Sequence, residues 1–169
     1  MDAPTGNPHL TAWHTLLQAH ASVVGALGRE LEDASGLTMS QYEVLLYLRY
    51  APEGRMRMQD LAASVLLSKS GVTRLVDRMA AGGMVEREAC ESDRRVTWAG
   101  ITDRGRQALR EASPVHLHGI RQHFARFLSE GEAATLAQLL GKVVHGAGEP
   151  SKLSPNALDD PITEPAGAG

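Results

Sequence analysis

The spacing of apolar residues changes once along this chain, and that change limits the folds open to it. Over most of residues 10–145, apolar residues recur every three or four positions, which is typical of amphipathic helices. Between Met84 and Ile101, apolar and charged residues instead alternate around a charged turn, which favours a small hairpin. Helices on both sides of one hairpin predict a mainly α fold with a small β-hairpin.

The composition supports a helical protein of a reducing compartment. Aromatic residues make up 4% of the chain, so Leu, Val, Ala and Met must fill the core, which favours helices over a β-sandwich. The single cysteine, Cys90, excludes a disulfide framework and a cysteine-rich zinc site. We find no apolar run long enough to span a membrane and no signal-peptide pattern at the N-terminus, so we expect a cytoplasmic protein without a membrane partner.

The first long helix is predicted from Leu10 to Leu31, with Gly36 as its stop. Its apolar face follows spacings of three and four residues, through Leu10, Trp13, Leu17, Ala21, Val24, Leu27 and Leu31. Ser40 then reads as the N-cap of a second helix, and Glu43 would complete a capping box with it. Pro52 and Gly54 end that second helix.

The C-terminal part of the chain is again helical. Thr102 is an N-cap candidate for a helix that Pro114 kinks or restarts. Ser129 and Glu132 form a second capping box before a last helix. We expect residues 1–9 and 146–169 to be disordered, because both are rich in Gly and Pro and the second is also acidic.

Residues 58–81 have the parts of a helix-turn-helix, namely a short helix, a break near Ser68 and a longer helix closed by Gly82. In the longer helix, Val72, Val76 and Met79 share one side with Leu75 and should pack inward. The residues left on the outer side are small, hydroxylated or basic, as a helix that reads a DNA groove requires. The outer residues predicted to bind DNA are Ser68, Lys69, Ser70, Thr73, Arg74 and Arg78; Asp77 lies on the same side but is not among the predicted DNA-binding residues.

The charged turn of the hairpin follows this helix directly and carries two adjacent arginines, Arg94 and Arg95. Such a tip suits a minor groove or a phosphate backbone, and Asp93 is placed to orient Arg95. Residues 51–110 hold eleven Lys and Arg and eight Asp and Glu, a net charge of +3, although the whole chain carries −3. The middle of the chain is therefore a basic region on an acidic protein, which indicates DNA binding.

These motifs resemble the MarR family of transcription regulators. The run from Asp93 to Thr102 resembles the family's wing signature, Asp-x-Arg with Leu-Thr beginning at the sixth residue after the arginine, and Ile101 stands in place of the leucine. The stretch 61–87, including Leu-Val-Asp-Arg, is similar to the family's helix-turn-helix core. The resemblance covers residues 10–145 and is specific over 61–105. It implies a winged helix-turn-helix lobe at 36–105 and dimerisation helices at 10–35 and 106–145.

The resemblance also implies a homodimer that many family members release from DNA when a small effector binds. From the residues alone, one helix-turn-helix reads few base pairs, so two copies would read a pseudo-palindrome with half-sites about 10 bp apart. We therefore expect a regulator of transcription, with repression as the favoured mode and double-stranded DNA as the partner. A winged-helix protein–protein interaction module is the alternative.

Seven histidines allow three interpretations. They are satisfied within the core edge or an interface, or they line a pocket for a small aromatic or carboxylate effector, or they bind zinc as in a zinc-responsive regulator. The effector interpretation places Trp13, His14, His20, Arg49 and His116 at the pocket. Zinc is disfavoured because no tight ligand spacing occurs. We predict no metal and no cofactor, and we predict no enzyme, because the sequence has no phosphate loop, nucleophile elbow or His-Glu-x-x-His motif.

Overall fold

The computed structural model describes residues 6–65, 68–89 and 96–146, and it confirms a mainly helical chain with a small sheet. Its α-helices and strands, in chain order, are α1 (Pro8–Ser35), α2 (Met39–Tyr50), β1 (Arg55–Arg57), α3 (Met58–Ser64), α4 (Lys69–Ala81), β2 (Val85–Ala89), β3 (Thr97–Ile101), α5 (Asp103–His123) and α6 (Glu130–Gly146). Two short 3-10 turns, Pro52–Gly54 and Ala125–Phe127, lie before β1 and α6.

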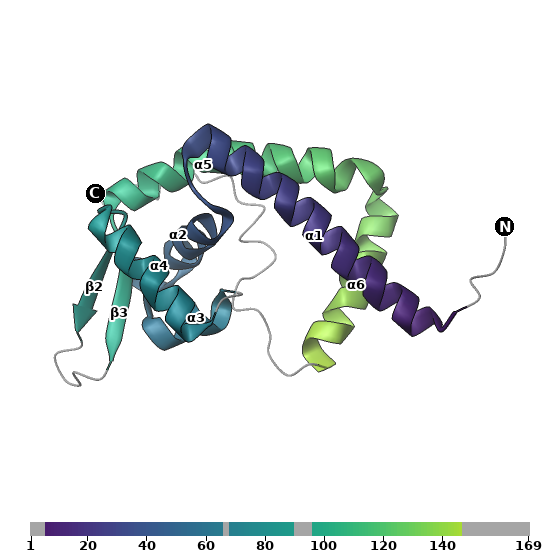
Figure 1. The fold of residues 1–169 in the computed structure, drawn as a ribbon, viewed down its shortest axis with the longest axis horizontal. Helices are drawn as coiled ribbons and strands as arrows, with labels where there is room; N and C mark the ends of the chain where they lie inside the picture. Colours follow the sequence, from purple (N-terminus) through teal and green to yellow (C-terminus); the bar gives the residue numbers. More distant parts are fainter. Residues whose placement is uncertain (1–5, 66–67, 90–95, 147–169) are drawn as a thin grey trace.

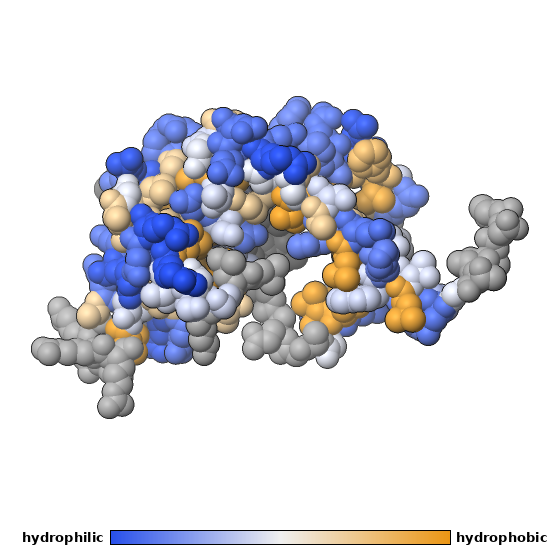
Figure 2. All heavy atoms as spheres, in the orientation of Figure 1, coloured by the Kyte–Doolittle hydropathy of each residue, from blue (hydrophilic) through white to orange (hydrophobic). Residues whose placement is uncertain are grey.

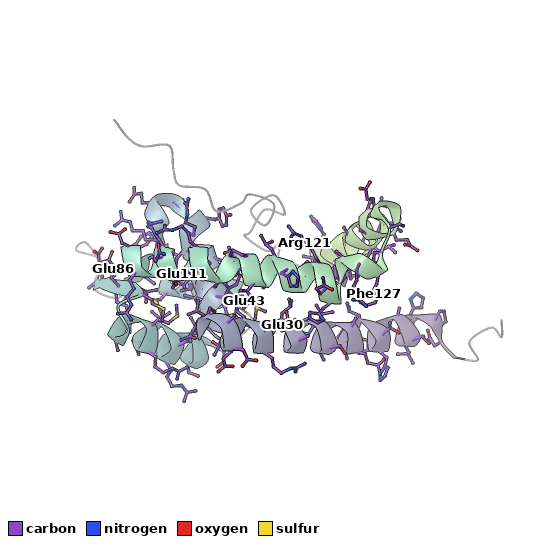
Figure 3. The ribbon with its side chains drawn as sticks, turned by 90° about the horizontal axis from the view of Figure 1, so that it is seen from above. Glu30, Glu43, Glu86, Glu111, Arg121 and Phe127 are labelled. Atoms are coloured by element: carbon purple, nitrogen blue, oxygen red, sulfur yellow. The ribbon has the colours of Figure 1, made fainter. Side chains whose placement is uncertain are left out.

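The long helices α1 and α5 form the frame of the molecule (Figure 1). Seen from above, they run alongside each other with Glu30 between them (Figure 3). A lobe of α2, α3, α4 and the sheet lies at one end of this pair, and α6 turns back at the other end. The frame therefore carries the predicted helix-turn-helix at one end and leaves the opposite end for another role.

The hydrophobic core lies in the lobe. Leu45 and Leu48 of α2 and Leu61 of α3 are fully buried together with Val76 and Met79 of α4. Burying a side chain of this kind contributes about 1.5–3 kcal/mol each, so the apolar side of α4 is fixed against α2 and α3. The opposite side of α4 must then face outward.

The first helix begins and ends close to the predicted positions. Gly36 ends α1 with a left-handed backbone, φ 71°, as expected. The start is earlier than expected, because the Asn7 side chain caps the helix by accepting a hydrogen bond from the His9 N–H at 2.9 Å. Residues 7–9 thus belong to the capped start of α1 rather than to a disordered segment.

The predicted capping box at Ser40 and Glu43 is wrong. Thr38 caps α2, accepting a hydrogen bond from the Gln41 N–H, while the Gln41 side chain accepts one from the Thr38 N–H at 2.9 Å. The helix starts earlier because Leu37 is buried directly after Gly36, which leaves Thr38 as the first residue free to cap.

The hairpin is confirmed, and it is part of a larger sheet. Strands β2 and β3 are antiparallel, with Arg87 opposite Ala99 and Glu88 opposite Trp98. Strand β1 adds to the other edge of β3, giving the order β1-β3-β2. We did not predict β1, because three residues are too few to display a period of two.

The cap of α5 is confirmed at Thr102, whose hydroxyl accepts a hydrogen bond from the Gly105 N–H at 3.1 Å. Pro114 lies inside α5, which continues to His123 without a restart. The second capping box is also confirmed, since the Ser129 N–H donates to the Glu132 carboxylate at 2.8 Å and the Glu132 N–H donates back to Ser129.

Candidate DNA-binding surface

Helix α4 has one buried side and one exposed side, as the sequence predicts. Val72, Leu75, Val76 and Met79 are buried, while Thr73, Arg74, Asp77 and Arg78 are exposed. Ser68 caps the helix, its Oγ accepting a hydrogen bond from the Gly71 N–H at 3.1 Å. The free N–H groups of the first turn lie at this same end, where a helix attracts anions.

The structure places most of the residues predicted on α4 to bind DNA on one surface. Ser68 and Ser70 are exposed at the start of α4, with their hydroxyl oxygens 3.3 Å apart. Arg74 and Arg78 follow one and two turns later, and neither forms an ion pair with another residue that the structure describes. Lys69 is the first residue of α4, but its side chain lies outside the described set. Which of these side chains contact DNA stays a prediction.

The predicted wing tip, Asp93, Arg94 and Arg95, lies outside the described residues. The strands that lead to it are fixed to the end of α4. The Thr102 hydroxyl donates to the Gly83 carbonyl at 2.7 Å, and the Thr102 N–H donates to the Met84 carbonyl at 3.2 Å. These two hydrogen bonds therefore join the base of the wing, at the turn between α4 and β2, to the N-cap of α5.

One contact between α4 and the wing was not predicted. Arg87 of β2 forms an ion pair with Asp77 of α4. The alternation in Glu86-Arg87-Glu88 was the available signal, because it puts Arg87 on the opposite face of the strand from its two acidic neighbours. Sequence alone did not say that this face meets α4.

The outer face of the sheet carries charged residues around one tryptophan. The guanidinium carbons of Arg55 and Arg57 lie 5.4 Å and 5.5 Å from the centre of the Trp98 ring, within the range of cation–π attraction. Arg55 also pairs with Glu53 at 2.5 Å and with Glu88 at 3.9 Å. Arg55, Trp98 and Glu88 line an open cavity of about 260 Å³, together with Glu53, Gly54, Glu86, Gly100 and Ile101.

The five residues predicted to line an effector pocket occupy three helices. Trp13, His14 and His20 are exposed along α1, Arg49 is half-buried on α2, and His116 is half-buried on α5. None of them lines the cavity of the wing sheet. A pocket formed by these residues stays a prediction.

His116 is half-buried at a polar junction between α2 and α5. Its ring contacts the Tyr42 ring at a tilt of 40°, with the ring centres 4.5 Å apart, and its Nδ1 is buried without a hydrogen-bond partner among the described residues. The Tyr42 and Ser113 hydroxyls lie 3.2 Å apart, and the Ser113 hydroxyl donates to the Leu109 carbonyl. Burial lowers the pKa of His116 and raises the pKa of Tyr42.

Two acidic side chains, Glu43 and Glu30, also lie where these helices meet. Burial raises the pKa of Glu43 on α2, an effect that the nearby charge of His20 on α1 opposes. The His123 ring nitrogen lies 2.6 Å from the Glu30 carboxylate and ties α5 to α1. Figure 3 shows Glu43 and Glu30 along the space where α1 and α5 run together.

No group of three potential metal ligands occurs among the residues that the structure describes. Within the same residues, no helix is both long and apolar enough to cross a membrane.

Comparison with known proteins agrees with this geometry. Residues 35–96, which include α4 and β2, match the MarR family model. The structure is similar to that of AbsC, a MarR family transcriptional regulator from Streptomyces coelicolor, with 33% identity and a TM-score of 0.77 over 88% of this chain and 100% of AbsC. The chain belongs to the MarR family of transcriptional regulators.

Two further relatives support the assignment. Sco3205, a MarR family transcriptional regulator from Streptomyces coelicolor solved in complex with DNA, has 28% identity and a TM-score of 0.78 over 88% of this chain and 96% of its own. The HTH-type transcriptional regulator MhqR of Bacillus subtilis is 28% identical over 76% of this chain and 86% of MhqR. These relatives are transcriptional regulators and not enzymes. The chain is thus a winged helix-turn-helix protein of a DNA-binding family.

Proposed function

We propose that this chain is a homodimeric repressor that binds a pseudo-palindromic DNA site with the exposed side of α4. The observation that carries the proposal is the division of α4, which buries its apolar residues and exposes Thr73, Arg74 and Arg78 beside a hydroxyl-rich N-terminus. In this arrangement Arg74 is suited to pair with a guanine edge, and the first turn is suited to a phosphate. Arg94 and Arg95 would contact a flanking minor groove or the backbone.

The proposal of a homodimer rests on apolar surface at the other end of the molecule. Leu10 and Trp13 of α1 are 65% and 58% exposed, and Val143 of α6 is 62% exposed. Figure 2 shows hydrophobic residues gathered over the N-terminal half of α1 and over α6. Helix α6 contains no buried residue at all, although 17 residues of an amphipathic helix need a surface to pack on.

A second copy of the chain is the occupant that fits this surface. The apolar side of α1 predicted from residue 10 to residue 31 is buried only at Leu27 and Leu31. The remainder is continuous with the frame that carries the lobe, so a two-fold axis near this end would present two copies of α4 to one face of a duplex. Such a dimer would cover about two turns of DNA and exclude other proteins from the site.

The test is selection of DNA by the full-length protein from a random duplex library. We expect enrichment of a pseudo-palindrome whose half-sites are centred about 10 bp apart. Binding of the enriched duplex should weaken steeply as salt rises, because several Lys and Arg release counterions from phosphates. Absence of any enriched sequence would contradict the proposal and favour the interaction-module alternative.

A reporter gene placed behind the enriched sequence tests the direction of regulation. Expression of the protein should lower reporter output, since the bound dimer occludes the promoter. An increase in output would identify an activator and refute the repressor assignment, without affecting the DNA-binding proposal.

We further propose that a small aromatic or carboxylate effector binds at the junction of α1, α2 and α5. This location, where the lobe meets the frame, is favoured by the buried Nδ1 of His116, which has no hydrogen-bond partner in the described part of the chain, and by the Tyr42–Ser113 hydroxyl pair. An effector there would favour a spacing of the two lobes that does not match the DNA site. Benzoate and phenol should raise the melting temperature of the protein, and should not do so in His116→Phe. Equal shifts in both proteins would place the binding elsewhere.

A further inference from the structure

The ion pair between Asp77 and Arg87 joins the two parts of the chain that are proposed to contact DNA. Asp77 lies on the outer side of α4, between Arg74 and Arg78 in sequence, and Arg87 lies on β2. The side chains are 50% and 34% exposed, so the pair sits at the edge of the lobe and not in its core. Arg87 is opposite Ala99, which is fully buried, so Arg87 belongs to the sheet face that packs on the lobe.

The ion pair lies far enough along β2 to influence the direction of the wing. Between α4 and β2 the chain turns through Gly82 and Gly83, the second with φ 73°, and this turn alone leaves the strand direction loosely specified. Hydrogen bonds from Thr102 fix the base of the wing at Gly83 and Met84. The Arg87 contact is further along β2, two residues before the strand ends at Ala89.

A carboxylate on the DNA-facing side of α4 needs an explanation, because it would repel phosphate. Two opposite charges in contact attract each other even near a protein surface, although water screens part of the attraction. Arg87 therefore both neutralises Asp77 and is directed by it. The negative charge of Asp77 by itself disfavours DNA binding. Asp77 can therefore favour DNA binding only by fixing the direction of β2.

We propose that Asp77 and Arg87 are positioning residues, which set the direction of the wing relative to α4 so that both reach one duplex. This inference rests on the proposed function, since it names residues that act through α4 and the wing. Neither side chain has to touch DNA. Their effect is to hold β2, and the wing that continues from it, at one angle to α4.

The charge of the two residues provides a sharp test. Asp77→Asn raises the net charge by one, and Arg87→Gln lowers it by one. If the pair acted only through net charge, the first variant would bind DNA more tightly and the second more weakly. If the pair positions the wing, both variants weaken binding to the enriched duplex. We expect a loss of about threefold to fivefold in each, the range that an exposed ion pair of up to ~1 kcal/mol supports.

Two further variants complete the design. Glu88→Gln is the matched control, because it makes the same charge change as Asp77→Asn and lies next to Arg87 on β2, but on the outer face, where Glu88 is 3.9 Å from Arg55. Asp77→Arg combined with Arg87→Asp restores the pair in reverse and should return the affinity to within about twofold of the wild type. Affinity for a random duplex should not fall in Asp77→Asn. Tighter binding of both duplexes by Asp77→Asn and Glu88→Gln alike would overturn the inference.

A distance measurement without DNA separates this inference from the proposed function. Spin labels at Ser70→Cys on α4 and Ala89→Cys on β2, in a Cys90→Ser background, report the angle between helix and wing. We expect one narrow distance distribution in the parent protein, a broader one with Asp77→Asn, and recovery with the reversed pair. An unchanged distribution would refute positioning whatever the DNA result. If the protein enriches no duplex while the distribution broadens, the DNA-binding proposal fails and the positioning role stands.

Discussion

Replacing Trp13 with serine should dissociate the proposed dimer. Trp13 is 58% exposed on the N-terminal half of α1, in a chain that buries none of α6. An exposed tryptophan of this size is the kind of anchor that dominates protein interfaces. In the proposed dimer, each protomer would contribute one such side chain to the shared apolar surface.

The size of the effect follows from the exposed area. If a tryptophan side chain buries on the order of 200 Å² when fully covered, the exposed fraction leaves roughly 120 Å² for a partner. At about 25 cal/mol per Å² this is ~3 kcal/mol per copy, and ~6 kcal/mol for the two copies. If half of that area is covered in the dimer, the dissociation constant rises by about two orders of magnitude.

Sedimentation velocity across a dilution series measures this shift directly. The wild type should sediment as a dimer at micromolar concentration, and Trp13→Ser should show a concentration-dependent monomer. Gln18→Ser, which also removes an exposed side chain from α1, is the control and should remain dimeric. A monomeric wild type, or a Trp13→Ser dimer as tight as the control, would refute the assignment of this surface.

Three other predictions concern Gly105, His116 and the two arginines of the predicted wing tip. Gly105→Ala should destabilise the protein by about 1–3 kcal/mol or prevent folding in denaturant titrations, because a Cβ there would overlap the Met84 carbonyl oxygen. Burial lowers the pKa of His116, so the unfolded chain takes up a proton first and stability falls as pH drops below about 6.5. His116→Phe should lose less stability than wild type between pH 7.5 and 5.5 in urea unfolding, and an equal loss would contradict this. Arg94→Ala with Arg95→Ala should weaken DNA binding and lower the salt slope by about four, because the dimer loses two arginines from each of its two wings, whereas an unchanged slope would remove the wing tip from the contact.

The parts of the fold that depend on local pattern could be read from the sequence. The inward side of α4, the hairpin strands and the cap at Thr102 each follow from spacing or from a short-range hydrogen bond. The start of α2 could not be placed, because Thr38 and Ser40 are both good caps and the burial of Leu37 decides between them. Local pattern is a weaker guide wherever tertiary contacts select between two equivalent signals.

The contacts that connect elements were beyond the sequence. Strand β1 exists because β3 offers it an edge, and the Asp77–Arg87 pair exists because the inner face of β2 meets α4. The apolar face of α1 was correctly read as one stripe, yet only the structure shows that Leu27 is buried while Leu10 is left exposed. The same pattern predicts a core and an interface equally well.

The most direct test of the central claim, that α4 reads bases, uses Arg74→Ala on the enriched duplex and on every single base-pair substitution of it. Wild type should discriminate at the contacted guanine by about 1–3 kcal/mol, and Arg74→Ala should lose that discrimination at one base pair in each half-site and nowhere else. Retention of the full base preference by Arg74→Ala, or equal weakening on every duplex, would contradict the account.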